Sequence, residues 1–313
     1  LVRLMAAGAA RCGSAATETY KEVRTWLLLP SWVLLLCLSL IPVGLMLVYS
    51  FLTKEFRGGV IWEFSLAAYD QFFFDRGLFG DEPAKIEWTY ISIFWRSIWQ
   101  AAAATLLSLL IGFPTAYFIA TRPKNSRTVW VFLITIPYWV NLLIRTVSMK
   151  FLLRGQGPLN NALIEIGLID TPLQIVNTNF AVQLGLFYSY LPFMVLPIYA
   201  AVERYNFSLS EAAADLYASK FTTLRRIVLP TVKPGVIAGC ILVFVPSLGS
   251  FLAPDLLGGA KNFMIGSLIE EQFKGNAGNW PFGAAASMVL LTMVLILLMV
   301  FSHQQSKNAK EAT

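Results

Sequence analysis

The sequence predicts an all-α membrane protein with six transmembrane helices, and three observations support this fold class. Hydrophobic residues make up 57% of the 313 residues, whereas only 13% are charged. Soluble domains carry about 25% charged residues, so this composition lies far outside their range. Several apolar runs also exceed the ~18 residues that a helix needs to cross a bilayer. Finally, lysine and arginine gather in alternate connecting segments, as in membrane proteins of defined orientation.

Six apolar segments supply the predicted helices, in chain order. They cover residues 26–51, 97–121, 128–153, 180–202, 234–257 and 282–302. Together they define one transmembrane domain over 26–302, flanked by tails at 1–25 and 303–313. The segment 52–96 is rich in acids and aromatics, and both a folded cap and an exposed loop are compatible with it.

Proline occurs inside five of these six segments. A proline kinks a helix and frees a backbone carbonyl, which in lipid must be satisfied by a neighbouring helix or a water-lined cavity. The prolines therefore favour helices packed around a pathway, although proline is also common in membrane helices generally. Those that lie away from the segment ends are Pro42, Pro114, Pro137, Pro192, Pro197 and Pro246.

The distribution of charge predicts the orientation. With six spans, both termini, the 122–127 link and the 203–233 loop share one side, which carries 14 lysines and arginines and 6 acids out of totals of 24 and 18. The excess of positive charge marks this side as cytoplasmic. The same topology accounts for the net charge of +6, so no nucleic-acid partner is expected.

The sequence lacks the motifs of the common enzyme and metal sites. It contains no C-x-x-C, H-E-x-x-H, G-x-S-x-G or Walker motif. Cys12, Cys37 and Cys240 have no metal or disulfide spacing, and the single histidine, His303, follows the last apolar segment. We therefore expect no enzyme, no metal and no cofactor bound by this chain.

The loop at 203–233 has the pattern of a docking helix. Ser208 and Glu211 have the S-x-x-E spacing of a capping box, which predicts a helix from Leu209. Alanines 212 and 213, with Leu216, give that helix a flat apolar strip. The following helix is predicted to end at Pro230. A short helix of this kind can lie in a membrane interface or fit a groove in a partner, and its acids and alanines favour the partner.

The residues of this loop carry a family resemblance. Glu211-Ala212-Ala213, followed by Ile227-Val228-Leu229-Pro230, resembles the EAA loop of bacterial ABC-importer permeases. The stretches PYWVNLLIRTVSMK at 137–150, DLLGGAKNFMIG at 255–266 and NWPFGAAAS at 279–287 resemble the spermidine/putrescine permease branch in particular. The likeness extends over about residues 26–302.

The resemblance implies a type I ABC-importer permease fold in the bacterial inner membrane, with a cytosolic EAA coupling helix. It implies as partners a second homologous permease, two ATPase subunits that use ATP and magnesium, a periplasmic polyamine-binding protein and membrane lipid. The residues it assigns to ATPase coupling are Glu211, Ala212, Ala213, Asp215, Tyr217, Leu229 and Pro230.

Tyr217 departs from the family pattern, which has glycine at this position. Glycine permits a positive φ at the turn between two helices, whereas a tyrosine there costs about 1–2 kcal/mol. We expect either a turn reshaped to ordinary φ or a tyrosine ring that enters the ATPase groove, and we favour the reshaped turn.

A polyamine is a flexible chain of positive charges, so its pathway needs carboxylates and aromatic faces. Asp255 lies at the outer end of the fifth span and is the best candidate acid, although a solvated helix-end carboxylate fits equally well. Arg145 does not suit a cation pathway unless it is paired. The candidate aromatic and polar lining comprises Tyr138, Trp139, Asn141, Tyr188 and Tyr190, although aromatic residues in spans more often serve packing.

Three alternatives remain open from the sequence. The same fold can import an amino acid, thiamine, iron or an anion, and Arg145 keeps this alternative in play. A stand-alone channel is less favoured because it needs no docking loop. A membrane-embedded enzyme lacks its catalytic residues.

Overall fold

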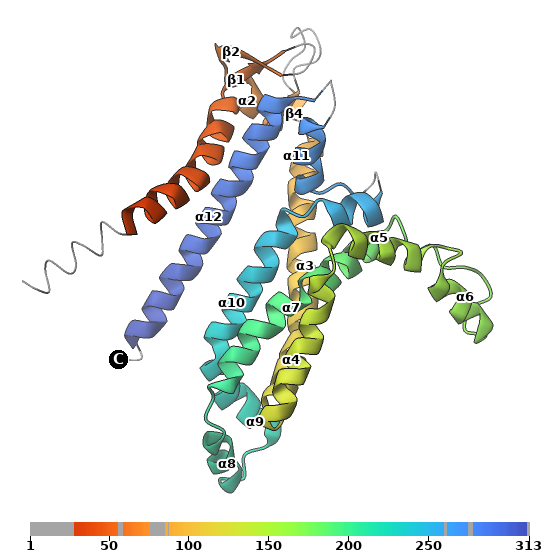
Figure 1. The fold of residues 1–313 in the computed structure, drawn as a ribbon, viewed down its shortest axis with the longest axis vertical. Coiled ribbons are helices and arrows are strands. Elements are labelled where there is room, and N and C mark those ends of the chain that lie inside the picture. The colour runs from red at the N-terminus through yellow and green to blue at the C-terminus, as the bar shows by residue number, and fades with distance from the viewer. Residues whose placement is uncertain are drawn as a thin grey trace, which may run out of the picture.

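The computed structural model describes residues 28–55, 59–75, 85–86, 88–259, 262–274 and 278–311. It is a bundle of long apolar helices, as predicted (Figure 1). Five described helices are long and apolar enough to cross a membrane, and a bent pair makes a sixth span. The predicted tail at 1–25 lies outside the described residues.

The first helix, Leu28–Tyr49, leads to a small folded unit at one end of the molecule. Strand β1 (Leu52–Lys54) pairs antiparallel with β2 (Val60–Phe64), α2 (Ala67–Phe73) follows, and a second hairpin pairs β3 (Phe74–Asp75) with β4 (Lys85–Ile86). The described part of 52–96 therefore folds as a cap rather than an open loop.

The cap is anchored by aromatic packing. Phe72 of α2 stacks on Phe282 with ring centroids 4.6 Å apart and meets Tyr90 edge-on at 6.1 Å. Phe282 belongs to α12 (Trp280–Glu311) and Tyr90 to α3 (Trp88–Ala120), and both helices begin at the cap end of the molecule. The sequence predicted the last span at 282–302, but the helix continues to Glu311 because residues 303–311 include good helix formers such as glutamine, lysine and alanine.

The third predicted span is broken. α4 (Lys124–Trp139) stops at Val140, and the following helices α5 (Leu142–Leu153) and α6 (Pro158–Glu165) leave at an angle of 88° to it. The predicted span over 128–153 is thus present only as a bent pair of helices, and the break at residues 140–141 was not predicted from the sequence. The break has a local cause, because Val140 is extended and the Asn141 side chain accepts the Leu143 N–H, which starts a new helix.

The chain then forms two further long helices. α7 (Asn179–Glu203) leads through α8 (Ser208–Asp215) to a helix that runs from Lys220 to Leu248. This helix comprises α9 (Lys220–Thr223), the π-helical turn η1 (Leu224–Val228) and α10 (Leu229–Leu248). Beyond it lie the π-helical turn η2 (Pro254–Gly258) and α11 (Ile265–Phe273).

Pro230 does not end this helix, contrary to the prediction. It stands in the first turn of α10, directly after η1. A proline lacks the N–H that would bond the carbonyl four residues earlier. The wider π-helical turn accommodates this defect, so the helix continues through Pro230.

Helices α3, α7 and α10 form the core of the bundle. Their shared cluster includes Ile119, Met194, Ile198 and Val243, each 1% exposed or less. Small residues allow this close approach, as is common where membrane helices pack. A Cβ on Gly239 would lie only 2.9 Å from the sulfur of Met194.

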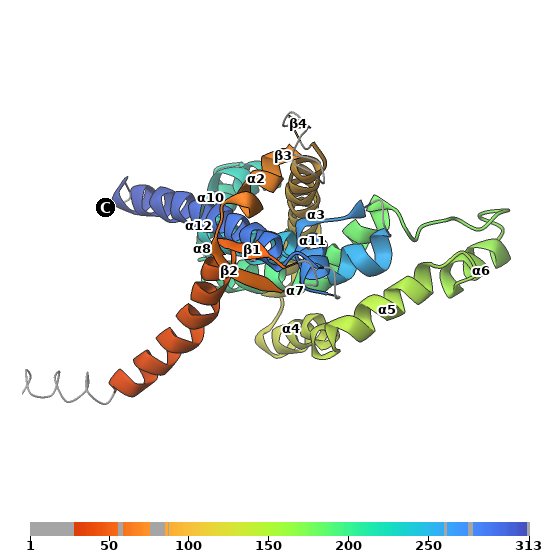
Figure 2. The same cartoon turned by 90° about the horizontal axis from the view of Figure 1, so that it is seen from above.

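The first helix lies outside this core. Within its most apolar 18 residues none is buried by the rest of the chain. Figures 1 and 2 both show it diverging from α12 as it leaves the cap. Its apolar surface therefore remains available to lipid or to another protein.

Candidate functional site

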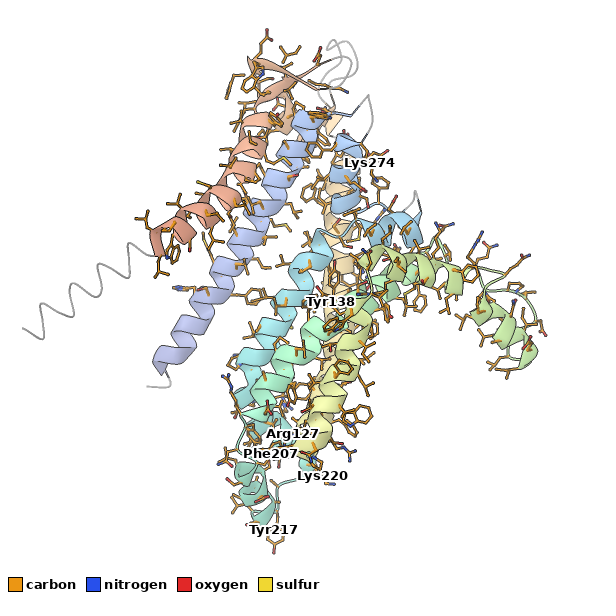
Figure 3. All side chains as sticks on the ribbon, viewed as in Figure 1. Arg127, Tyr138, Phe207, Tyr217, Lys220 and Lys274 are labelled. Atoms are coloured by element: carbon orange, nitrogen blue, oxygen red, sulfur yellow. The ribbon has the colours of Figure 1, made fainter. Side chains whose placement is uncertain are left out.

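The predicted docking loop, residues 203–233, forms the end of the molecule opposite the cap (Figure 1). α7 ends at Glu203, and α8 lies beyond the end of the bundle before the chain returns through α9. Figure 3 shows Tyr217 at the tip of this loop. The loop thus projects furthest from the helices that would lie in the membrane.

α8 begins without the predicted capping box. Its N-cap residue is Phe207, so Ser208 already lies inside the helix. The Ser208 N–H donates to Asn206 Oδ1 over 3.1 Å, and the Glu211 N–H donates to the Phe207 carbonyl over 3.2 Å. Asn206 provides the turn that starts this helix, because an asparagine side chain readily accepts the N–H two residues on.

The two motif alanines differ in burial. Ala213 is only 6% exposed and packs toward the bundle, whereas Ala212 is exposed. Phe207 helps to hold α8 there, because its ring lies 5.2 Å from that of Tyr205 and 6.5 Å from that of Tyr117 in α3. Ala213 therefore anchors the helix within the chain, and Ala212 is free to meet a partner.

Tyr217 adopts a left-handed conformation, with φ of 57°. Its N–H donates to the Ala214 carbonyl over 2.9 Å, and the Ala218 N–H donates to the Ala213 carbonyl over 3.0 Å. This pair of bonds is the Schellman motif that ends many helices, with Tyr217 at the position usually taken by glycine. The favoured prediction of a turn with ordinary φ is wrong, because these two bonds require the left-handed residue.

The ring of Tyr217 is 98% exposed. No packing within the described chain therefore offsets the strain of about 1–2 kcal/mol that a tyrosine incurs in this conformation. The ring is therefore accessible to a partner, and its contact with the ATPase groove stays a prediction.

Tyr217→Gly is expected to stabilise the loop by about 1 kcal/mol, because glycine adopts this φ freely. We expect ATPase activity coupled to transport to stay the same or rise. The matched control is Tyr217→Ala, which removes the ring but retains the Cβ strain. A large loss of activity in both variants would show that the ring itself is required.

Three side chains form the exposed apolar surface of α8. Leu209, Ala212 and Leu216 are exposed and spaced i, i+3 and i+7, so they form one stripe along the helix. Leu216 is 82% exposed, and Phe221, at the start of the returning helix, is 70% exposed. We call Leu209, Ala212 and Leu216 the α8 stripe. Leu209, Leu216 and Phe221 were not among the predicted coupling residues, although their spacing and type were visible in the sequence.

The remaining predicted coupling residues lie on either side of this stripe. Glu211 and Asp215 are exposed on α8 itself. Leu229 and Pro230 are exposed at the base of α10, beyond the π-helical turn. They belong to the helix that returns from the loop, Lys220–Leu248, which is long enough to cross a membrane.

Two of the predicted pathway tyrosines, Tyr138 and Tyr188, lie against the buried Arg145. The Arg145 guanidinium carbon lies 5.5 Å from the ring centre of Tyr138 in α4 and 6.0 Å from that of Tyr188 in α7. Phe193 packs edge-on against Tyr138 at 5.1 Å and lies 6.3 Å from Tyr190. The structure thus joins Tyr138, Tyr188 and Tyr190 into one cluster, in which Phe193 was not predicted.

The other predicted pathway residues have different positions. Trp139 is 81% exposed at the end of α4, and the side chain of Asn141 is used to start α5. Tyr190 donates its hydroxyl to the Pro246 carbonyl over 3.3 Å, which links α7 to the last turns of α10. The bond gives the carbonyl of Pro246, near the end of α10, a hydrogen-bond partner. Backbone polar groups next to a proline in a membrane helix need such partners.

Asp255 is exposed on η2, where its charge acts on Lys274. The pKa of Lys274 is raised, first by its hydrogen bond to Glu270 and then by the charges of Glu270, Asp255 and Glu271. Lys274 and Glu270 form an ion pair of 2.5 Å at the end of α11. Figure 3 shows Lys274 nearer the cap than Tyr138. Asp255 therefore belongs to an acidic group on the cap side of the bundle.

Metal-ligating side chains do not gather in the part of the chain that the structure describes. No group of three or more histidine, cysteine, aspartate or glutamate side chains lies close enough there to hold an ion. The features open to function are thus the loop with its α8 stripe and the tyrosine cluster.

Residues 112–307 match the family model described as binding-protein-dependent transport system inner membrane component. The chain is 45% identical over 212 residues to the spermidine/putrescine transport system permease protein PotB of Escherichia coli K12, covering 68% of this chain and 77% of that protein. It is 38% identical over 271 residues to PotB of Haemophilus influenzae, covering 87% and 89%.

Solved structures share the fold. A bacterial ABC transporter involved in the import of the acidic polysaccharide alginate has a chain that aligns with 93% of this one, at a TM-score of 0.63 and 19% identity. The same kind of transporter in complex with an alginate-bound periplasmic protein aligns with 92%, at a TM-score of 0.59. At this identity the likeness concerns the arrangement of helices alone.

Proposed function

Since the chain belongs to the family of binding-protein-dependent transport system inner membrane components, we propose that it is a permease subunit of an ATP-driven importer of polyamines. It is a multi-pass protein of the inner membrane and not itself an enzyme. The observation that carries the substrate is the 38% identity over 87% of the chain to a spermidine/putrescine permease. The cluster of Tyr138, Tyr188 and Tyr190 suits a cationic substrate, because aromatic faces attract organic cations.

ATP hydrolysis is assigned to separate ATPase subunits, which bind ATP and magnesium. The α8 stripe supports this assignment, since a short helix with apolar residues at i, i+3 and i+7 suits a groove in a partner. The loop, and with it both termini, then faces the cytoplasm, in agreement with the distribution of lysine and arginine. The cap and the acidic group of Asp255, Glu270 and Glu271 face a periplasmic polyamine-binding protein.

A second, homologous permease completes the pathway. The first helix, Leu28–Tyr49, supports this partner because none of its most apolar window is buried within the chain. Helices exposed on all sides are covered by lipid or by another membrane helix, and an adjacent permease supplies such helices. Two permeases of this kind enclose a pathway between them, with lipid around the outside.

The test measures uptake of radiolabelled spermidine and putrescine into liposomes. The liposomes contain this permease, the second permease, the ATPase subunits and the polyamine-binding protein. We expect ATP-dependent accumulation of polyamine that is competed by unlabelled polyamine but not by amino acids or thiamine. Vesicles without ATP are the control for leakage. If the complete complex hydrolyses ATP but accumulates no polyamine, the substrate assignment fails and the permease assignment stands.

An importer of an anionic solute is the second candidate. The buried Arg145 favours it, because a fixed cation among the tyrosines suits an anion. In the same uptake assay this candidate predicts accumulation of a labelled anion and no effect of spermidine.

A further inference from the structure

Arg145 is a buried cation at the bend of the third membrane segment. Only 6% of the residue is exposed, and its Nη2 donates to the carbonyl of Val140, the residue at the break, over 2.8 Å. That bond satisfies a carbonyl left free where α4 ends. Among the described residues, the Arg145 Nε has no hydrogen-bond partner.

The guanidinium also has no acidic partner in the described chain. The described ion pairs join Arg127 to Glu203 and Lys274 to Glu270, and neither includes Arg145. A buried charge without a counter-ion is unfavourable, so other contacts must favour it here. The contacts present are the faces of Tyr138 and Tyr188, both at or within 6.0 Å of the guanidinium carbon. This is the distance over which a cation is attracted to an aromatic ring.

The two rings come from different helices, α4 and α7, and Arg145 reaches them from α5, beyond the bend. Tyr138 lies one residue before the end of α4, and Tyr188 lies within α7. The rings remain 51% and 38% exposed, respectively, although the arginine between them is buried. The arrangement is therefore a site for an organic cation whose present occupant is a side chain of the chain itself.

We propose that Arg145 is a tethered cation that fills an alkylammonium site formed by Tyr138 and Tyr188. In this conformation the arginine excludes a substrate ammonium group, by occupying the ring faces and by repelling like charge. When the bend between α4 and α5 changes, the guanidinium leaves the rings and the ammonium takes its place. This inference rests on the proposed function, which supplies the identity of the substrate. Within the proposed site, Arg145 is a specificity-determining residue.

The experiment measures binding of labelled spermidine to the full complex in lipid nanodiscs, without ATP and without binding protein. Arg145→Gln retains a donor for the Val140 carbonyl but removes the charge. We expect it to bind spermidine about tenfold more tightly than the unchanged protein. Arg145→Lys retains the charge and is expected to bind like the unchanged protein. Tyr138→Leu in the Arg145→Gln background is expected to abolish the gain.

Two results overturn the inference. One is unchanged affinity in folded Arg145→Gln, and the other is an equal gain in Arg145→Lys. If Arg145→Gln fails to fold, Arg145→Met takes its place, because it removes the charge and keeps a long side chain at this position. It is expected to bind spermidine more tightly than the unchanged protein, and unchanged affinity in the folded variant contradicts the inference.

The outcome is separable from that of the proposed function. If the unchanged complex does not import spermidine, the substrate assignment fails. The site is then tested with labelled tetramethylammonium, which needs only aromatic faces. Tighter binding of that probe by Arg145→Gln supports the tethered cation, and equal binding contradicts it.

Discussion

Ala212→Asp is expected to abolish association with the ATPase subunits while leaving the permease folded. Ala212 is exposed in the middle of the α8 stripe, so the substitution disturbs no packing within the chain. At the interface it places a carboxylate between Leu209 and Leu216, where burial without a partner costs several kcal/mol. The measurement is the amount of ATPase that co-purifies with the tagged permease, together with ATP-dependent uptake.

The matched control is Ala214→Asp, on the same helix two residues further along. Ala214 is also exposed, but it borders a cavity of about 700 Å³ between α3 and α8 and lies away from the stripe. Both variants change helix propensity equally. We expect ATPase to co-purify with Ala214→Asp and not with Ala212→Asp. Equal retention in both variants contradicts the assignment of the stripe as the docking surface. Ala213 is not a useful probe, because it is buried within the chain.

Gly235→Ala is expected to destabilise the folded permease by about 1–3 kcal/mol, the usual cost of an overpacked core. Gly235 lies in α10, where an added Cβ would meet the Cβ of Ala201 and come within 2.8 Å of the Pro197 carbonyl oxygen. Both neighbours lie on α7, and a backbone oxygen cannot move aside as a side chain can. The helices must therefore separate, which weakens the core that α7 forms with α10.

The measurement is the midpoint of thermal unfolding in detergent, with Gly44→Ala as the control. A Cβ added to Gly44, in the first helix, meets no atom within 4 Å. Alanine there favours the helix by about 0.5–1 kcal/mol. We expect a lower midpoint for Gly235→Ala and an equal or higher one for Gly44→Ala. Equal midpoints for the two variants would falsify the close packing of α7 on α10.

Much of the fold was predictable because lipid restricts the choices. An apolar run long enough to cross a bilayer must satisfy its backbone internally, so length and composition predict a helix. The runs 97–121, 180–202 and 282–302 lie within or close to observed helices. The run 128–153 was equally apolar and breaks at Asn141, because a single side chain starts a second helix there. Composition carries no signal for such a break.

The position of the loop at 203–233 was predictable from the sequence, but the exposure of its alanines and the backbone conformation of Tyr217 were not. Its polarity and its alanines stood out against an apolar chain, so its position was evident from the sequence. Which alanine faces outward depends on how α8 packs against α3 through Phe207 and Tyr117. Tyr217 was expected to avoid a positive φ, and the hydrogen bonds to Ala213 and Ala214 impose one.

The sequence by itself determined that this chain is a helical membrane protein with a polar loop at residues 203–233, because hydrophobicity and charge act locally and are read directly from residue types. Only the tertiary structure decided what surrounds Arg145. Tyr138, Arg145 and Tyr188 come from three helices, and an 88° bend brings them together. Contacts between helices depend on crossing angles and on small residues at each crossing, which no single segment encodes.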